Sequence, residues 1–465
     1  MMKIFFILVV VLFFLSIPSA LSYGGDPEII TEGYKIEKFI TGLNVPIALD
    51  FIDDDIFVIQ KNDGMVRLIQ NNILQDEPVL NLEVSNYGEQ GLLGIATTDN
   101  KIYLFVSEAF HDGGLSLGNK IFQYNWDGEQ ISQKKLIKSL PGWIQGYNAG
   151  VMTNGLDNNI FAVSGSQYKF GALQNIALEE SVNCKTDKII CKDENRVTFS
   201  DSIRHTLSCM NVSFYHYTTN PFGHQDVQPD LSQNILELNP LNIMTNLGSC
   251  MNAFFFDNFS NGDWKDTGVI LQIEPEDDSY RAIGIRNSFG LTVDPLTGNL
   301  WMTENGPDKF DEINLVENKF NSGWAKILGP IKDQNLEKIH PYEDYVYSDP
   351  EFSWELPIGI TAIDFNNNSF PTHQNSLFVA DSNNGNIYAL KLNPDRNGFE
   401  FKSKHLKDLI VNIDPENTSG NFHESMNEII FAKNIGVITD MKFGPDGNLY
   451  VVSIMDGTIY KISLI

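Results

Sequence analysis

The clearest group of residues that could do chemistry lies between Gly306 and Glu312, where turn carbonyls and carboxylates come together. Gly306 and Pro307 would offer carbonyl oxygens at a turn, one of them unhindered by a side chain. Calcium prefers six to eight hard oxygen ligands, so Glu312 with loop carbonyls and water would suit it. The alternative is that Asp311 and Glu312 are solvated turn acids. These oxygen atoms would be chemically suited to calcium.

Histidines offer a second candidate metal site. His205, His216 and His224 lie in one cysteine-containing segment and could gather around copper or zinc. The competing interpretation is that they are exposed or hydrogen-bonded structural residues of a polar loop. No Ser-His-Asp order, phosphate-cradling loop or dinucleotide fingerprint stands out, so the sequence does not support hydrolase activity.

One pattern recurs along the chain: an apolar run, an Asp/Asn/Gly turn and a second strand-like run. Short strands of period two around tight turns are typical of radial β repetition. We therefore predict an all-β fold, a six-bladed β-propeller over residues 23–465. Pairing of strand 34–43 with the last strand, 457–465, would close the ring and remove an exposed sheet edge. The six hairpins are 48–60, 94–107, 150–166, 290–306, 360–381 and 438–453.

The gap between the third and fourth repeats is much longer than the others. We interpret residues from about 175 to 262 as an insertion between the third and fourth blades, pinned by disulfides. Four cysteines allow three pairings, of which we favour Cys184 with Cys191 and Cys209 with Cys250. A zinc site is a weaker interpretation, because neither the spacing nor an oxidising compartment favours one.

The N-terminus indicates export. Residues 1–22 contain one lysine, an apolar run and small residues before Tyr23, which is typical of a signal peptide. The alternative is an uncleaved anchor, although the run is shorter than the roughly 20 residues of a spanning helix. We expect an extracytoplasmic protein, secreted or at the cell surface, with no membrane span after cleavage. The net charge of −28 argues against nucleic acid and anionic membranes as partners.

Several segments resemble the glucose/sorbosone dehydrogenases: GEQGLLGIA (88–96), RNSFGLTVDPLTGNLWMTENGP (286–307), DEINLVENKFNSGW (311–324) and FGPDGNLYVV (443–452). The resemblance implies a quinoprotein propeller in which pyrroloquinoline quinone lies over the channel mouth, calcium polarises it and an aldose is oxidised. It implies that Arg286, Asn287 and Thr361 contact the quinone. The carbonyls of Gly306 and Pro307 would bind the cofactor calcium, whereas Glu312 and Ser322 would bind a structural calcium.

Other positions depart from that pattern. Tyr147 stands where the resemblance implies a histidine base, and a phenol with a pKa near 10 is a poor replacement. Two further members of the catalytic set are also replaced, and so are three cations that would hold the carboxylates of the quinone. These positions are Ser166, Phe289, Asn383, Val437 and Thr439.

Two hypotheses follow from these departures. We favour a divergent or non-catalytic propeller that binds a sugar or other small molecule at the channel mouth, or an extracellular protein or glycan. The alternative is an active quinoprotein aldose dehydrogenase with a remodelled pocket. Three tryptophans are expected as wedges between blades rather than as sugar platforms: Trp301, Trp324 and Trp354.

Overall fold

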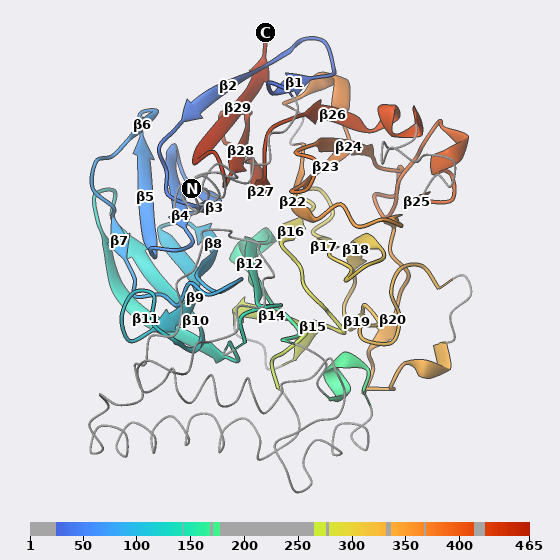
Figure 1. Cartoon of the computed structure of the whole chain (residues 1–465), viewed down its shortest axis with the longest axis horizontal. Coiled ribbons are helices and arrows are strands. Elements are labelled where there is room, and N and C mark those ends of the chain that lie inside the picture. The colour runs from blue at the N-terminus through green and yellow to red at the C-terminus, as the bar shows by residue number, and fades with distance from the viewer. Residues whose placement is uncertain are drawn as a thin grey trace, which may run out of the picture.

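The computed structural model is a ring of β-sheets around a central channel (Figure 1). It describes residues 25–142, 144–167, 171–176, 265–275, 279–331, 336–366, 369–412 and 424–465. The predicted all-β propeller is confirmed. Between the sheets lie short 3-10 helices, namely η1 (Leu156–Asn158), η2 (Ala172–Gln174), η5 (Leu336–Lys338), η6 (Pro371–His373), η7 (Lys404–Leu406) and η8 (Glu424–Glu428).

The strands of the described residues pair into six sheets, each numbered here from its innermost strand outward. The first three sheets follow the chain from the N-terminus. The first contains β3 (Pro46–Ile52), β4 (Asp55–Gln60), β5 (Met65–Gln70), β6 (Ile73–Leu74) and β7 (Leu80–Asn81). The second contains β8 (Leu92–Thr98), β9 (Lys101–Ala109), β10 (Ser116–Trp126) and β11 (Ile131–Leu140). The third contains β12 (Ala149–Asn154), β13 (Ile160–Ser164), β14 (Val269–Glu274), β15 (Tyr280–Ile283), β19 (Phe320–Asn321) and β20 (Val346–Tyr347).

The remaining three sheets complete the ring. The fourth contains β16 (Gly290–Val293), β17 (Leu300–Glu304), β18 (Asp311–Val316), β21 (Phe352–Trp354) and β25 (Ile410–Val411). The fifth contains β22 (Ile360–Phe365), β23 (Ser376–Asp381), β24 (Ile387–Lys391), β26 (Ile430–Lys433) and β1 (Glu28–Ile29). The sixth contains β27 (Ile438–Phe443), β28 (Leu449–Ser453), β29 (Thr458–Leu464) and β2 (Tyr34–Ile40).

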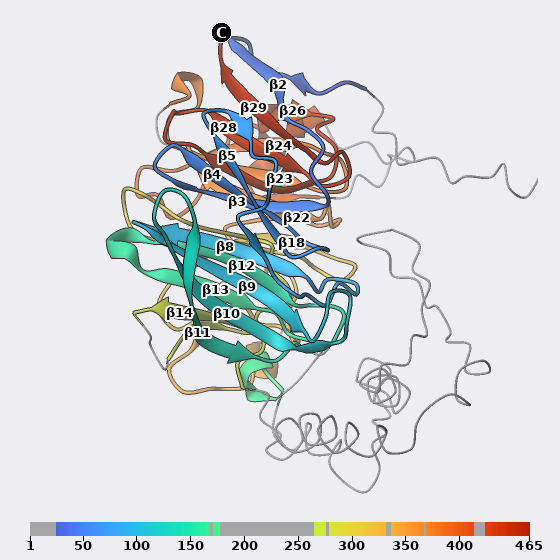
Figure 2. The same ribbon diagram turned by 90° about the vertical axis from the view of Figure 1, so that its left-hand side faces the viewer.

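Each repeat found in the sequence is an antiparallel hairpin that supplies the two innermost strands of one sheet. The turn residues of the repeats adopt the left-handed backbone that such turns require, as at Asp53 (φ 51°) and Asp99 (φ 47°). The ring closes as predicted, because β2 pairs antiparallel with β29 from Tyr34↔Leu464 to Ile40↔Ile459. Figure 2 shows these two strands side by side.

The insertion lies elsewhere than predicted. Strand β13 pairs with β14, with Ser164 opposite Val269, so the long segment between them interrupts the third sheet rather than separating the third and fourth blades. The repeat pattern could not show this, because it marks only the first two strands of each sheet. Several predictions concern residues outside the described ranges: the signal peptide 1–22, the cysteines Cys184, Cys191, Cys209 and Cys250, and the histidines His205, His216 and His224.

The core lies between neighbouring sheets. Among the described residues, six clusters of buried apolar side chains each join two adjacent sheets. Trp301 and Trp354 are fully buried in the cluster between the fourth and fifth sheets, which confirms that they act as wedges. Because each sheet buries both faces against its neighbours, the ring holds the loops at its two ends in fixed positions.

Aspartates on the innermost strands tie each sheet to the next. Asp50 Oδ2 accepts the Thr97 N–H at 2.8 Å, and Asp364 Oδ2 accepts the Phe443 N–H at 2.7 Å. Asp440 Oδ2 accepts the Leu49 N–H at 2.9 Å, which joins the last sheet to the first. The innermost strands enclose a channel with about 650 Å³ of unfilled space, lined mainly by apolar side chains.

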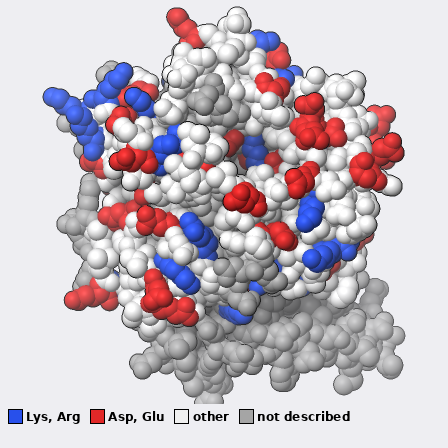
Figure 3. Space-filling view, turned by 180° about the vertical axis from the view of Figure 1, so that it is seen from behind, with Lys and Arg blue, Asp and Glu red and all other residues white. Residues whose placement is uncertain are grey.

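No helix in the described part of the chain is both long and apolar enough to cross a membrane. Acidic side chains outnumber basic ones on the face shown in Figure 3, in keeping with the net charge.

Candidate functional site

The candidate site lies at one end of the channel. At this end the chain enters the innermost strand of each sheet and leaves the second strand. Tyr147 precedes β12, whereas Arg286 and Asn287 precede β16. Two residues that the sequence analysis did not select lie at the same end: Lys61 follows β4 and Glu89 precedes β8. Strands from four sheets therefore place these side chains around one mouth.

Arg286 is the central cation of the mouth, and its contacts are internal. Its side chain is 7% exposed, and Nη1 donates to the Asn305 carbonyl at 2.6 Å. The guanidinium carbon lies 4.4 Å from the centre of the Tyr147 ring and 5.5 Å from that of the Trp324 ring. Trp324, predicted to be a wedge between blades, thus contacts the site instead.

Asn287 and Glu89 connect three sheets at the mouth. Asn287 Nδ2 donates to both carboxylate oxygens of Glu89, at 3.3 and 3.2 Å, and Asn287 Oδ1 accepts the Ala149 N–H at 3.1 Å. Glu89 Oε2 also accepts the Asn148 N–H at 3.0 Å. Desolvation raises the pKa of Glu89, although the amide donors and Arg286 oppose this shift.

Lys61 supports the turn that carries Glu89. Its Nζ donates to the Gly88 carbonyl at 2.8 Å and to Asn62 Oδ1 at 3.2 Å. Burial lowers the pKa of Lys61 to about 8, and the negative charge of Glu89 partly counters that shift. No sequence signal marks Lys61, because its burial depends on the packing of the first sheet against the second.

The sequence analysis also missed a group of polar atoms below the mouth. Of the fifteen buried side-chain atoms without a hydrogen-bond partner in the described part of the chain, four belong to this group: Ser166 Oγ, Gln167 Oε1, Arg286 Nε and Asn305 Oδ1. They are neighbours, because the Ser166 N–H donates to the Arg286 carbonyl at 2.9 Å and Arg286 donates to the Asn305 carbonyl. Buried polar atoms normally have a partner, so a cluster of unpaired ones indicates a place for water or a ligand.

The fifth and sixth sheets bring no cation from the three replaced positions to this mouth. Asn383 is exposed, and Val437 and Thr439 are buried apolar and hydroxyl side chains. Thr361 donates its hydroxyl to the Ile438 carbonyl at 2.6 Å. Lys442 lies along the channel wall and forms an ion pair with Asp50 at 3.1 Å.

A pair of buried glutamates lies beside the mouth. Glu304 on β17 is the cross-strand partner of Glu312 on β18, and both are at least 93% buried. The Ser322 hydroxyl donates to Glu304 Oε2, whereas the Gly329 N–H donates to Glu312 Oε1 at 2.6 Å. Burial raises the pKa of both carboxyls, and the charge of Glu304 raises that of Glu312 further.

Asp311 has a structural role. Its Oδ1 accepts the Gly306 N–H at 3.0 Å, and its Oδ2 accepts the N–H groups of Ile358, Gly359 and Ile360 at 2.8, 2.6 and 3.3 Å. The side chain is fully buried. The alternative that Asp311 and Glu312 are solvated turn acids is therefore wrong, because both lie inside β18.

The oxygen atoms near the glutamate pair are of the kind that a hard cation binds, but they are few. Glu304, Glu312 and Ser322 come together as oxygen ligands, and the Gly306–Pro307 turn lies close by in the chain after β17. An added Cβ at Gly306 would lie 1.9 Å from the Lys309 carbonyl oxygen and 2.2 Å from that of Phe310, so backbone carbonyls crowd this turn. The described residues contain no group of three or more His, Cys, Asp or Glu side chains suited to a metal. Calcium here would depend on carbonyls and water.

The residues do not fit a quinone that carries carboxylates. Arg286, Asn287 and Thr361 each use side-chain donors on other protein groups. Glu89 adds a carboxylate at the mouth, and positions 383, 437 and 439 carry no charge. Anion binding usually relies on charge-assisted hydrogen bonds, and among the described residues at this mouth only the Arg286 guanidinium, through its unpaired Nε, could offer one.

Comparison with known proteins agrees with the fold. The model of the "Glucose / Sorbosone dehydrogenase" family matches residues 272–461, from β14 to β29. Aldose sugar dehydrogenase YliI of Escherichia coli is 27% identical over 184 residues, which are 39% of this chain and 42% of that protein. The C-terminal part of the chain is therefore similar to the glucose/sorbosone dehydrogenase family, as the resemblance in the sequence implies. The stretch matched in the Escherichia coli member covers well under half of that protein.

Other proteins that the chain is similar to are more distant. Quinoprotein glucose dehydrogenase B of Acinetobacter calcoaceticus is 22% identical over 310 residues, covering 64% of this chain and 54% of its own. The quinone-bound aldose sugar dehydrogenase of Streptomyces coelicolor superposes with a TM-score of 0.53 at 15% identity, covering 93% of this chain and 98% of its own. The apo-form of the soluble Escherichia coli enzyme gives 0.52 at 16% identity, covering 93% of this chain and all of its own. At these identities the superpositions show a shared fold.

Proposed function

We propose that this protein is an exported propeller that binds a polyhydroxyl molecule, such as a sugar, at the channel mouth without quinone-dependent oxidation. Loops of several sheets converge at the mouth, which is where a propeller normally binds its ligand. The proposal includes an extracytoplasmic location, for which the sequence of residues 1–22 is the support.

The observation that carries the proposal is the group of unpaired atoms around Arg286. Arg286 Nε can only donate, and Gln167 Oε1 and Asn305 Oδ1 can only accept, whereas the Ser166 hydroxyl can do both. A ligand hydroxyl can donate and accept at once, so a sugar could satisfy donors and acceptors that a purely anionic or cationic ligand could not. The aromatic rings of Tyr147 and Trp324 lie beside the same group.

The absence of a suitable base supports the non-catalytic half of the proposal. Tyr147 stands where the resemblance implies a histidine, and a phenol is a poor general base at neutral pH. Ser166 cannot orient a base by charge, and its backbone N–H is bonded to the Arg286 carbonyl.

Calorimetry with the purified full chain tests the proposal. Glucose, xylose and a disaccharide are titrated separately, and a matched series adds pyrroloquinoline quinone with calcium while dye reduction is followed. We expect heat of sugar binding that is lost in Gln167→Leu and retained in Asn383→Leu, an exposed position. Quinone-dependent dye reduction, or the absence of any sugar binding, would contradict the proposal.

The second candidate function is an active quinoprotein aldose dehydrogenase with a remodelled pocket. Lys61 favours it, because a buried lysine near the mouth could replace one of the missing cations. Lys61→Met would then abolish quinone binding. If the first candidate function holds, Lys61→Met would change the dissociation constant for the sugar by no more than a few-fold.

A further inference from the structure

The most unusual group at the mouth is the carboxylate of Glu89. It lies where three sheets meet and is held by the Asn148 N–H and by Asn287 Nδ2. Among the described residues, neither Lys61 nor Arg286 forms an ion pair with it within 4.0 Å. Glu89 is therefore a carboxylate held mainly by uncharged amide donors.

The two nearby cations are occupied elsewhere. Lys61 Nζ donates to the Gly88 carbonyl and Asn62 Oδ1, and Arg286 Nη1 donates to the Asn305 carbonyl. These contacts hold Lys61 Nζ and Arg286 Nη1 on backbone and amide oxygens, so both cations act on Glu89 through space rather than by a direct ion pair. A carboxylate has about four lone-pair sites, so Glu89 can accept further hydrogen bonds.

Glu89 is partly buried, whereas Asn287 and Arg286 are 3% and 7% exposed. The unpaired Nε of Arg286, in a side chain more than nine-tenths buried, lies in the same group of loops. Asn287 follows Arg286 in the chain and donates to Glu89, and Arg286 and Glu89 interact electrostatically, so a ligand held by Arg286 would lie near Glu89.

We propose that Glu89 determines the charge of the ligand that the mouth accepts, favouring sugars with hydroxyl or ammonium groups and rejecting sugars with a carboxylate at that position. A lone carboxylate accepts hydrogen bonds from ammonium and hydroxyl groups but repels a second carboxylate. This inference rests on the proposed sugar-binding function and adds the class of ligand, an amino sugar. It also gives a physical reason why the mouth does not suit an anionic quinone.

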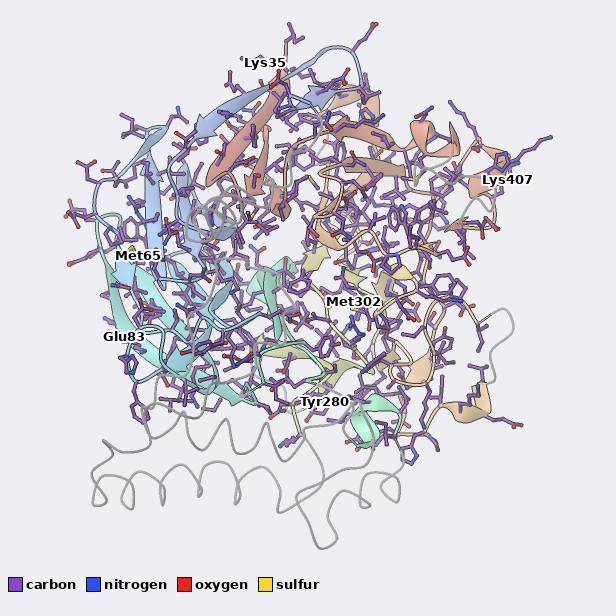
Figure 4. All side chains as sticks on the ribbon, viewed as in Figure 1. Lys35, Met65, Glu83, Tyr280, Met302 and Lys407 are labelled. Atoms are coloured by element: carbon purple, nitrogen blue, oxygen red, sulfur yellow. The ribbon has the colours of Figure 1, made fainter. Side chains whose placement is uncertain are left out.

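Three sugars of the same ring size test the inference. Glucosamine, glucose and glucuronate are titrated calorimetrically at pH 6.5 into the full chain, into Glu89→Gln and into Glu83→Gln. The Glu83 variant is the matched control, because it removes one exposed carboxylate near the outer edge of the ring (Figure 4). Glu89→Gln keeps the size and an acceptor oxygen but removes the charge.

We expect the unchanged chain to bind glucosamine at least tenfold more tightly than glucuronate, as a single charge at short range can provide. Glu89→Gln should reduce that ratio to within about threefold, and Glu83→Gln should preserve it. Sugar binding with the same ratio in Glu89→Gln, or tighter binding of glucuronate, would overturn the role of Glu89 alone. Failure of all three sugars to bind would overturn both this inference and the proposed function.

Discussion

The Arg286 guanidinium carbon lies 4.4 Å from the centre of the Tyr147 ring. The two residues belong to loops that enter different sheets, and they are 139 positions apart by subtraction of their numbers. The ring thus covers part of the one cation that the family resemblance assigns to the cofactor. Tyr147, which stands where the resemblance implies a base, packs against Arg286.

Loss of the Tyr147 ring should destabilise the protein modestly. Tyr147→Ala removes the cation–π contact with Arg286, for which we expect a loss of about 1–2 kcal/mol in the free energy of unfolding. Tyr147→Phe keeps the ring and should lose less than half of that. Urea unfolding followed by tryptophan fluorescence measures both, and equal losses in the two variants would show that the hydroxyl, not the ring, matters.

Asp311 should be one of the most sensitive positions for stability. Asp311→Ala leaves the buried N–H groups of Ile358, Gly359 and Ile360 without their acceptor, which should lower the free energy of unfolding by about 3–5 kcal/mol. Asp311→Asn keeps one acceptor oxygen and should lose less. Asp308→Ala, at an exposed position two residues after Gly306, is the control and should change stability by less than about 0.5 kcal/mol.

The buried glutamate pair should make stability fall as pH rises. The folded-state pKa values of Glu304 and Glu312 are raised above the unfolded value near 4.5. Between the unfolded and the folded pKa values, the folded chain therefore binds more protons than the unfolded chain. Stability from these groups is therefore greatest below about pH 5 and declines towards pH 8, by at most about 1.4 kcal/mol per pH unit per proton.

Glu312→Gln should flatten that pH dependence and stabilise the protein at pH 8. The amide removes the repulsion with Glu304 and still accepts the Gly329 N–H. Asn314 can turn its amide to accept from the new side chain, because Asn314 Oδ1 has no partner in the described residues. Unfolding by urea at pH 5.5, 6.5, 7.5 and 8.0 is the measurement, and an unchanged slope would refute the assignment.

Calcium should oppose the same repulsion if it binds at this pair. At pH 7.5, calcium at 100 times its dissociation constant would add about 2.7 kcal/mol to the free energy of unfolding. We expect the melting temperature to rise with calcium, to return with a chelator and not to respond in Glu312→Gln. Magnesium, which prefers a tighter octahedral set of ligands, is the control ion. An identical shift in Glu312→Gln would place the ion elsewhere.

The repeated hairpins could be predicted because strand pairing within a hairpin is local. The turns at Asp53 and Asp99 and the alternating apolar residues around them carry the signal for both strands. The prediction that the insertion lies between the third and fourth blades was wrong, because β13 and β14 are distant in sequence. The residues of either strand do not indicate which other strand it pairs with. The candidate site was predicted in part: Arg286, Asn287 and Tyr147 do meet at the mouth, but Glu89, Lys61 and Glu304 did not stand out.

The sequence by itself determined the all-β propeller, the closing strand and the family resemblance, since each depends on short patterns of turn and strand residues. Only the tertiary structure decided how the charged groups at the mouth are used. Whether Glu89 meets Asn287, or Arg286 meets Tyr147, depends on which loops converge when the sheets close into a ring. Burial then sets the charge and hydrogen bonding of Lys61, Glu304 and Glu312, because desolvation is a property of the packed neighbours and not of the residue itself.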